Sequence, residues 1–177
     1  MPQHKQVTIH TDGGCSGNPG IGGWAAVLTS GNHRREISGG VAATTNNRME
    51  LQAAIEALAA LKVPCEVTFF TDSNYVKNGV TEWIFGWKRN GWMTKAKQPV
   101  KNADLWRELD RHTQRHEITW QWLKGHAGHA ENERCDVLAN EAIAQIRKDF
   151  PPEHLRRALD VFRSSEGAPA DANGTLL

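Results

Sequence analysis

The sequence predicts an α/β fold in which helices pack on a mixed β-sheet. The first part of the chain has three short segments in which apolar and polar residues alternate, as they do in half-buried strands, and turn-length connections join them. Such a run of strands favours an antiparallel meander. Farther along the chain, strand-like segments alternate with helix-like segments, which favours a sheet covered by helices.

The predicted meander consists of residues 7–11, 24–28 and 35–41. The first segment, Val-Thr-Ile-His-Thr, runs into Asp12-Gly13-Gly14, a sequence typical of a turn. The second and third segments are separated by Ser30-Gly31-Asn32, which predicts a tight turn between neighbouring strands.

The clearest helix is predicted over residues 47–62. Apolar residues recur there at helical spacing, at Leu51, Ala54, Ile55, Leu58 and Leu61. Pro64 ends this helix, and residues 66–70 follow as a more buried strand. Either Asp72 or Ser73 is then expected to cap the next helix.

The remaining elements of the domain are a helix, a strand and a helix. Residues 103–114 are predicted to be helical, Ile118, Trp120 and Trp122 alternate on one face of the last strand, and residues 133–147 form a final helix. Pro151-Pro152 breaks this pattern; residues 153–163 are predicted as a short helix and residues 164–177 as disordered. We therefore predict one domain over residues 1–147 and a partly disordered extension over residues 148–177.

The composition excludes several classes of protein. With 39% hydrophobic and 23% charged residues, the 177-residue chain has the make-up of a soluble globular protein, and no stretch has the apolar length of a membrane span. Cys15, Cys65 and Cys135 are too few for a disulfide framework, so free and mostly buried thiols are expected. The N-terminal residues lead directly into a strand and leave no room for a signal peptide. We expect a cytoplasmic protein with no membrane contact.

Four carboxylates are candidate metal ligands. Asp12 and Asp72 each follow a predicted strand, at the edge where open α/β sheets bind ligands. Taken alone, Asp12 is more simply explained as a turn residue and Asp72 as a helix cap. Glu50 and Asp136 lie near the starts of predicted helices, at the border of the apolar stripe, where a carboxylate is either a solvated flank residue or compensated by a partner. Four acids that converge on one sheet edge would repel one another without a cation.

Ligation by oxygen alone favours Mg²⁺ or Mn²⁺ and phosphate chemistry. Two such ions, roughly 3.5–4 Å apart, can activate a water and stabilise the leaving oxygen, which predicts a hydrolase of phosphodiesters. His126, between two glycines of the loop over residues 124–129, suits a proton shuttle near neutral pH, with a plain loop histidine as the alternative. Zinc ligation by His126 and His129 is disfavoured because no cysteine or third histidine lies at suitable spacing. His129 is given no role.

A basic, tryptophan-rich stretch lies at about residues 83–102. The net charge of the chain is only +1, but this stretch carries several cations and no acid. Cations bind phosphates and aromatic faces pack on sugars or bases, although tryptophans that anchor a solvated loop would explain part of the pattern. The residues concerned are Trp83, Trp87, Lys88, Arg89, Trp92, Lys95, Lys97 and Lys101.

Several motifs occur together and in a specific order. They are Thr11-Asp12-Gly13-Gly14, Thr45-Asn46-Asn47-Arg48-Met49-Glu50-Leu51, Thr71-Asp72-Ser73, Lys124-Gly125-His126-Ala127-Gly128 and Asn132-Glu133-Arg134-Cys135-Asp136. In these motifs the chain resembles bacterial ribonuclease HI, of the type 1 ribonuclease H family, from about Gln6 to Ala144 without large gaps.

This resemblance implies a fold and an active site. The fold is a ribonuclease H-like five-stranded mixed sheet, with the first three strands antiparallel, flanked by helices. The four carboxylates Asp12, Glu50, Asp72 and Asp136 match a site that binds two Mg²⁺ ions with substrate, Mn²⁺ being an alternative, and His126 matches a loop histidine that assists turnover.

The resemblance also implies the reaction and the substrate. The family hydrolyses the RNA strand of RNA–DNA hybrids and leaves 3′-hydroxyl and 5′-phosphate ends, and a monomer is expected. Residues 83–102 resemble a basic protrusion that grips the DNA strand. Positions near the substrate backbones, where 2′-hydroxyls and a DNA phosphate are sensed, match Cys15, Asn18, Thr45, Asn46, Asn47 and Ser73.

Some positions depart from the family pattern, and two other functions share its features. Asn74, Asn78 and Glu82 stand where longer glutamines are frequent, so affinity for the substrate or tolerance of salt is expected to differ. A non-catalytic hybrid-binding module would lack at least one acid, whereas all four are present. A DNA nuclease of the integrase or resolvase type shares the acids, but the Thr45-Asn46-Asn47 turn and the basic protrusion argue against it.

Overall fold

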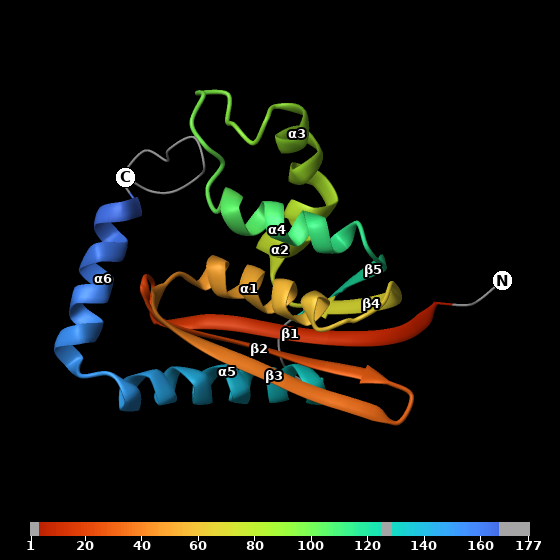
Figure 1. Ribbon diagram of the computed structural model, residues 1–177, viewed down its shortest axis with the longest axis horizontal. Helices are drawn as coiled ribbons and strands as arrows, with labels where there is room; N and C mark the ends of the chain where they lie inside the picture. Colours follow the sequence, from red (N-terminus) through yellow and green to blue (C-terminus); the bar gives the residue numbers. More distant parts are fainter. Residues whose placement is uncertain (1–3, 125–128, 167–177) are drawn as a thin grey trace.

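The computed structural model describes residues 4–124 and 129–166. Its centre is a five-stranded sheet (Figure 1). In spatial order the strands are β3 (His33–Thr44), β2 (Gly20–Ser30), β1 (Lys5–Gly17), β4 (Cys65–Thr71) and β5 (Glu117–Trp122). The first three strands pair antiparallel, whereas β1 with β4 and β4 with β5 pair parallel. The predicted mixed sheet is confirmed.

Helices cover both faces of this sheet. Figure 1 shows α1 (Asn46–Ala59) on one face and α5 (Ala130–Asp149) on the other, with α4 (Ala103–Thr113) packed outside α1. The main core lies between the sheet, α1 and α4, and includes the fully buried ring of Trp106. A smaller core of β2 and α5 residues fills the opposite face.

One predicted turn is wrong. β1 does not end at Thr11 but continues through Asp12, Gly13 and Gly14, which pair with residues of β2. The glycines are needed for packing rather than for chain reversal, because a Cβ at Gly13 would lie 2.5 Å from the carbonyl carbon of Met49 in α1. The predicted hairpin between β2 and β3 is confirmed, with Gly31 at a positive φ of 58°.

The segment after β4 contains more helix than the sequence predicts. It forms α2 (Asn74–Asn78), a π-helical turn η1 (Gly79–Trp83) and α3 (Ile84–Arg89). The π turn lies where Gly79 meets Trp106, since a Cβ on Gly79 would lie 1.9 Å from that ring.

The C-terminal part also differs in its boundaries. α5 begins three residues earlier than the predicted residue 133. α6 (Pro152–Glu166) continues through residues 164–166, which the sequence predicted to be disordered. The rest of the predicted disordered tail lies outside the described residues. Within the described part of the chain, every helix is too short or too polar to span a membrane. All three cysteines are free, with Cys65 and Cys135 buried as expected.

Two histidines near the end of α4 link stability to pH. His116 is buried, and its Nδ1 accepts a hydrogen bond of 3.0 Å from the backbone N–H of Cys65. Burial lowers the pKa of His116 and also lowers the pKa of His112. The unfolded chain therefore binds protons more readily than the folded protein. The stabilisation is complete above the unfolded pKa of about 6.5 and is lost as the pH falls toward the lower folded-state values.

We expect the His116→Gln variant to show a smaller loss of melting temperature than the unaltered protein between about pH 7.5 and pH 5.5, because one lowered pKa is removed. Glutamine keeps an acceptor for the Cys65 N–H. Thermal unfolding followed by circular dichroism at several pH values measures the effect. His33→Gln, altered at an exposed position in the hairpin, is the control and should keep the full pH dependence. Identical profiles for the two variants would contradict the assignment.

Candidate active site

Three carboxylates meet at one edge of the sheet. Asp12 from β1, Glu50 from α1 and Asp72, directly after β4, offer ligand atoms that all lie within 4.8 Å of one another. The topology explains the meeting of the two aspartates. Parallel pairing of β1 with β4 ends at His10 and Phe70, so each aspartate lies two residues beyond the last pair on adjacent strands.

Glu50 joins the aspartates because α1 approaches β1 unusually closely. The nearest atoms to a Cβ built on Gly13 belong to the backbone of Met49 and Glu50, at 2.5–2.7 Å. Only a residue without a side chain allows this approach. The glycine after Asp12 thus positions Glu50 in the cluster.

The electrostatics of this cluster fit a cation. Asp12 is only 6% exposed, and the Oε2 atom of Glu50 is buried without a hydrogen-bond partner among the described residues. Burial, followed by the charges of Asp12 and Asp72, raises the pKa of Glu50 well above its ordinary value. Carboxylate oxygens are the ligands preferred by Mg²⁺ and Mn²⁺. The three residues therefore fit a divalent metal ion of that kind.

The simpler explanations of the two aspartates do not hold. Ser73, not Asp72, is the N-cap of α2, since its hydroxyl accepts a hydrogen bond of 3.1 Å from the N–H of Val76. Asp12 lies within a strand, where its Oδ1 accepts a hydrogen bond of 3.0 Å from the N–H of Gly13.

The other two predicted catalytic residues are not placed in the cluster. Asp136 is exposed on α5 and is not part of the 4.8 Å group found among the described residues. The turn that carries it does lie on β1, because the Sγ atom of Cys135 donates to the carbonyl oxygen of His10 at 3.3 Å. His126 lies outside the described residues. Roles for Asp136 and His126 stay predictions.

Most of the predicted backbone-sensing residues gather at the start of α1. Thr45 caps this helix by accepting from the N–H of Arg48 at 3.2 Å. Asn46 ties the helix to the end of β1, because its Oδ1 accepts from the N–H of Cys15 at 2.8 Å and its own N–H donates to Oδ1 of Asn18 at 3.1 Å. Asn47 is exposed beside them, whereas Ser73 is buried at α2.

The sequence analysis gave no role to Arg48. Its guanidinium donates to both carboxylate oxygens of Asp104, at 3.0 and 2.8 Å, and to Oδ1 of Asn102 at 3.2 Å. These bonds fix the start of α1 against the end of the basic stretch. The place of Arg48 in the Asn-Asn-Arg motif was the only sequence feature that could have indicated this role, because a single arginine has no distinctive pattern of its own.

The basic stretch forms a protrusion made of α3 and the loop that follows it (Figure 1). Its tryptophans mainly anchor it. Trp87 packs in tilted contacts against Trp83, Trp92 and Trp106 at centroid distances of 5.3–6.2 Å. Trp87 and Trp92 are half-buried, whereas Trp83 is exposed.

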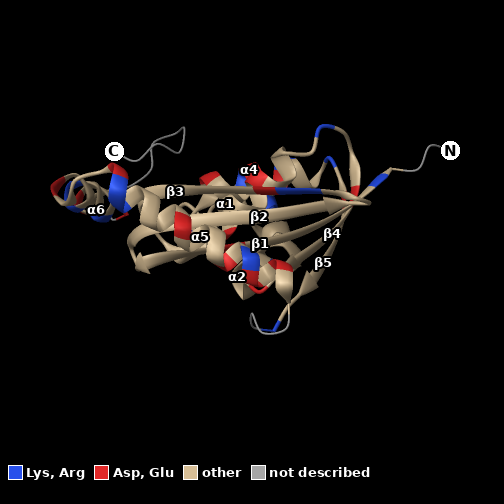
Figure 2. Ribbon diagram, turned by 90° about the horizontal axis from the view of Figure 1, so that it is seen from below, with Lys and Arg blue, Asp and Glu red and all other residues tan. Residues whose placement is uncertain are grey.

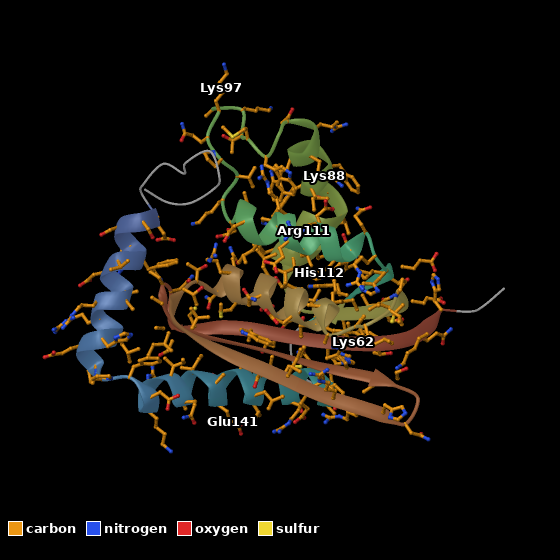
Figure 3. The ribbon with its side chains drawn as sticks, viewed as in Figure 1. Lys62, Lys88, Lys97, Arg111, His112 and Glu141 are labelled. Atoms are coloured by element: carbon orange, nitrogen blue, oxygen red, sulfur yellow. The ribbon has the colours of Figure 1, made fainter. Side chains whose placement is uncertain are left out.

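The cations of the protrusion differ in their surroundings. Lys88 pairs with Asp110 of α4, with its Nζ 3.1 Å from Oδ2. Lys97 extends from the far end of the protrusion, away from the rest of the molecule (Figure 3). Exposed positions are also held by Arg89, Lys95 and Lys101. The stretch therefore has the features of both interpretations: aromatic rings that anchor it and cations on its surface.

Comparisons with known proteins match this geometry. The RNase H family model matches residues 4–144. Ribonuclease HI of Neisseria meningitidis is 61% identical over 143 residues, which are 81% of this chain and 99% of that protein. Ribonuclease H of Mesorhizobium japonicum is 60% identical over 149 residues, 84% of each chain.

Solved structures show the same fold. LC9-RNase H1, a type 1 RNase H, superposes with a TM-score of 0.74 at 33% identity, covering 82% of this chain and 74% of that one. LC11-RNase H1, solved in complex with an RNA/DNA hybrid, superposes with a TM-score of 0.60 at 27% identity, covering 78% of this chain and 97% of that one. The chain belongs to the ribonuclease H family.

Proposed function

We propose that the protein hydrolyses the RNA strand of RNA–DNA hybrids by a two-metal-ion mechanism and leaves 3′-hydroxyl and 5′-phosphate ends. The observation that carries this proposal is the cluster of Asp12, Glu50 and Asp72 on the sheet of a ribonuclease H. The identity of about 60% to curated ribonucleases H supports it.

The carboxylates would hold Mg²⁺, with Mn²⁺ as a substitute. Asp12, Glu50 and Asp72 supply oxygen ligands, and we assign Asp136 to the same set. When bound, two divalent ions activate a water and neutralise charge on the leaving oxygen. The protein's own part is to hold these ligands close together on β1, α1 and the end of β4. His126 is proposed to carry a proton during turnover.

Recognition of the hybrid is assigned to the start of α1 and to the protrusion. The amide of Asn47 can donate to and accept from a 2′-hydroxyl, the group that distinguishes RNA from DNA locally. The hydrogen bonds that join Asn46 to Cys15 and Asn18 hold this surface rigid. The exposed cations of the protrusion then bind phosphates of the DNA strand.

Within the protrusion, we expect Lys97→Gln to weaken hybrid binding more than Lys88→Gln. Lys97 lies at the exposed tip, whereas the charge of Lys88 is already partly compensated by Asp110. Loss of one phosphate contact should reduce the slope of log affinity against log salt by about 1. Binding titrations at several salt concentrations measure both variants. A larger effect of Lys88→Gln would contradict this assignment.

The proposed activity is tested by incubating the protein with a labelled RNA–DNA hybrid, single-stranded RNA and duplex DNA, each with Mg²⁺ and with EDTA. We expect cleavage only of the RNA strand of the hybrid, and none in EDTA. Tight binding of the hybrid without cleavage would indicate a binding module instead. Cleavage of duplex DNA would indicate a nuclease of the integrase or resolvase type.

We further propose that the protein acts as a monomer in the cytoplasm. Its large exposed apolar side chains are spread over several elements rather than forming one interface, and include Val63, Phe85, Val137 and Val161. Free thiols suit a reducing compartment. Analytical ultracentrifugation tests the oligomeric state, and cell fractionation tests the location.

A further inference from the structure

The extension after the family domain reaches the proposed substrate surface. Glu166, the last residue of α6, lines a hollow of about 280 Å³. The other residues around this hollow are Asn18, Pro19, Thr45, Asn47, Lys101 and Asn102. Four of them, Asn18, Thr45, Asn47 and Lys101, are residues assigned above to contact with the hybrid. The family model ends at residue 144, so Glu166 is contributed by a segment outside it.

The path of the chain explains how α6 arrives there. α5 crosses one face of the sheet, and the chain turns sharply at Phe150 and Pro151, where the carbonyl oxygen of Pro151 accepts from the N–H groups of His154 and Leu155. α6 then packs against β3, the edge strand of the sheet. Figure 1 shows α6 passing the edge of the sheet, so that its end lies on the same side as α4 and the protrusion.

α6 is held only weakly. None of its residues is buried, and the half-buried Leu155, Leu159 and Phe162 recur at helical spacing on one side. Val161, between them in sequence, is 68% exposed. A helix that buries little apolar surface is released at a small cost compared with a core helix such as α1. Displacement of α6 therefore leaves the rest of the fold intact.

The sign of the charge at the hollow decides what α6 does there. Both signs of charge occur along α6 (Figure 2), with three arginines balanced by three acids. The helix as a whole is therefore not a positively charged surface for binding phosphates. The residue of α6 that lines the hollow is the acidic Glu166, and Lys101 lines the same hollow. A substrate phosphate that enters this hollow meets a charge of its own sign.

We propose that α6 is an autoinhibitory cover: Glu166 competes with a backbone phosphate of the hybrid for this hollow, and hybrid binding displaces the end of α6. This inference rests on the proposed function, because it requires the hybrid to be the ligand of the surface.

The first test compares two variants that lose the same charge at opposite ends of α6. Glu166→Gln is expected to lower the Kd for a labelled hybrid about fivefold, the effect of one unit-charge repulsion at about 4 Å in water. Glu153→Gln is the matched control and should leave the Kd unchanged. Fluorescence anisotropy in EDTA at low salt measures binding without cleavage. Equal Kd values for the two variants, or weaker binding by Glu166→Gln, would contradict the proposal that α6 is an autoinhibitory cover.

The second test addresses displacement directly. Hydrogen exchange of the α6 amides should become faster when the hybrid binds to the unaltered protein, and Phe162→Ser, which removes a half-buried contact of α6, should also bind the hybrid more tightly. Unchanged or slower exchange overturns the proposal. If the protein cleaves the hybrid but fails these tests, the autoinhibition proposal is wrong and the proposed function stands. If the protein neither binds nor cleaves the hybrid, both proposals are wrong.

Discussion

Replacing Asp12 by asparagine is expected to reduce cleavage of the hybrid severely while raising the melting temperature of the metal-free protein. Asp12 is buried and shares the 4.8 Å cluster with Glu50 and Asp72. Loss of one central ligand should lower kcat by about a thousandfold, equivalent to about 4 kcal/mol. The same change removes one of the charges that raise the pKa of Glu50, so repulsion in the folded state decreases. A gain of about 1 kcal/mol corresponds to about 2–4 °C.

The matched control is Asp136→Asn, which removes a carboxylate that is exposed and outside the cluster. Its metal-free stability should change by about 0.5 kcal/mol or less, as at other surface positions. Asp136 is proposed as a metal ligand, so the cleavage activity of Asp136→Asn should fall although its stability hardly changes. Calorimetry in EDTA and steady-state cleavage assays give the two readouts. If Asp12→Asn melts no higher than Asp136→Asn, the three acids do not repel one another as the geometry indicates.

Addition of Mg²⁺ extends this argument. The ion should stabilise the unaltered protein more than Asp12→Asn, because a site with fewer carboxylates binds it less tightly. The stabilisation of each protein by Mg²⁺ is thus a measure of the cluster that does not depend on catalysis.

The elements that the sequence predicts well are those with a strong periodic pattern. Leu51, Ile55 and Leu58 recur at helical spacing in what proves to be α1, and all three are buried. The two-residue hairpin between β2 and β3 follows from local turn chemistry. The π turn at Gly79 has no such signal, because it depends on the ring of Trp106, which lies 27 positions later in the sequence.

The site shows a similar division. Sequence order alone places Asp12 and Asp72 after predicted strands, and the parallel pairing of those strands brings them together. The position of Asp136 relative to the cluster depends on how α5 lies across the opposite face of the sheet, which no local pattern specifies. The placement of Glu166 beside the hollow that Lys101 also lines is likewise tertiary, because it depends on an extension and a loop far apart in sequence.

The turn wrongly predicted at Asp12-Gly13-Gly14 leads to the second large effect. Gly13→Ala is expected to destabilise the fold by about 3 kcal/mol and to reduce hybrid cleavage at least tenfold. The added Cβ would lie 2.5–2.7 Å from backbone atoms of Met49 and Glu50, which cannot rotate away as a side chain can. α1 must therefore shift outward, and Glu50 moves with it relative to Asp12.

Gly14→Ala is the matched control, since the nearest atom to its Cβ is Oδ1 of Asn46 at 3.8 Å, an ordinary contact. Its stability should stay within about 1 kcal/mol of the unaltered protein, because alanine costs no more backbone entropy than glycine in a strand. Chemical denaturation and cleavage assays on both variants separate the two positions. If Gly13→Ala were as stable and as active as Gly14→Ala, the approach of α1 to β1 would not be what sets the position of Glu50. If only Gly13→Ala loses both properties, the Asp-Gly pair is required as a packing unit: the aspartate supplies the ligand, and the glycine admits the helix that supplies the next one.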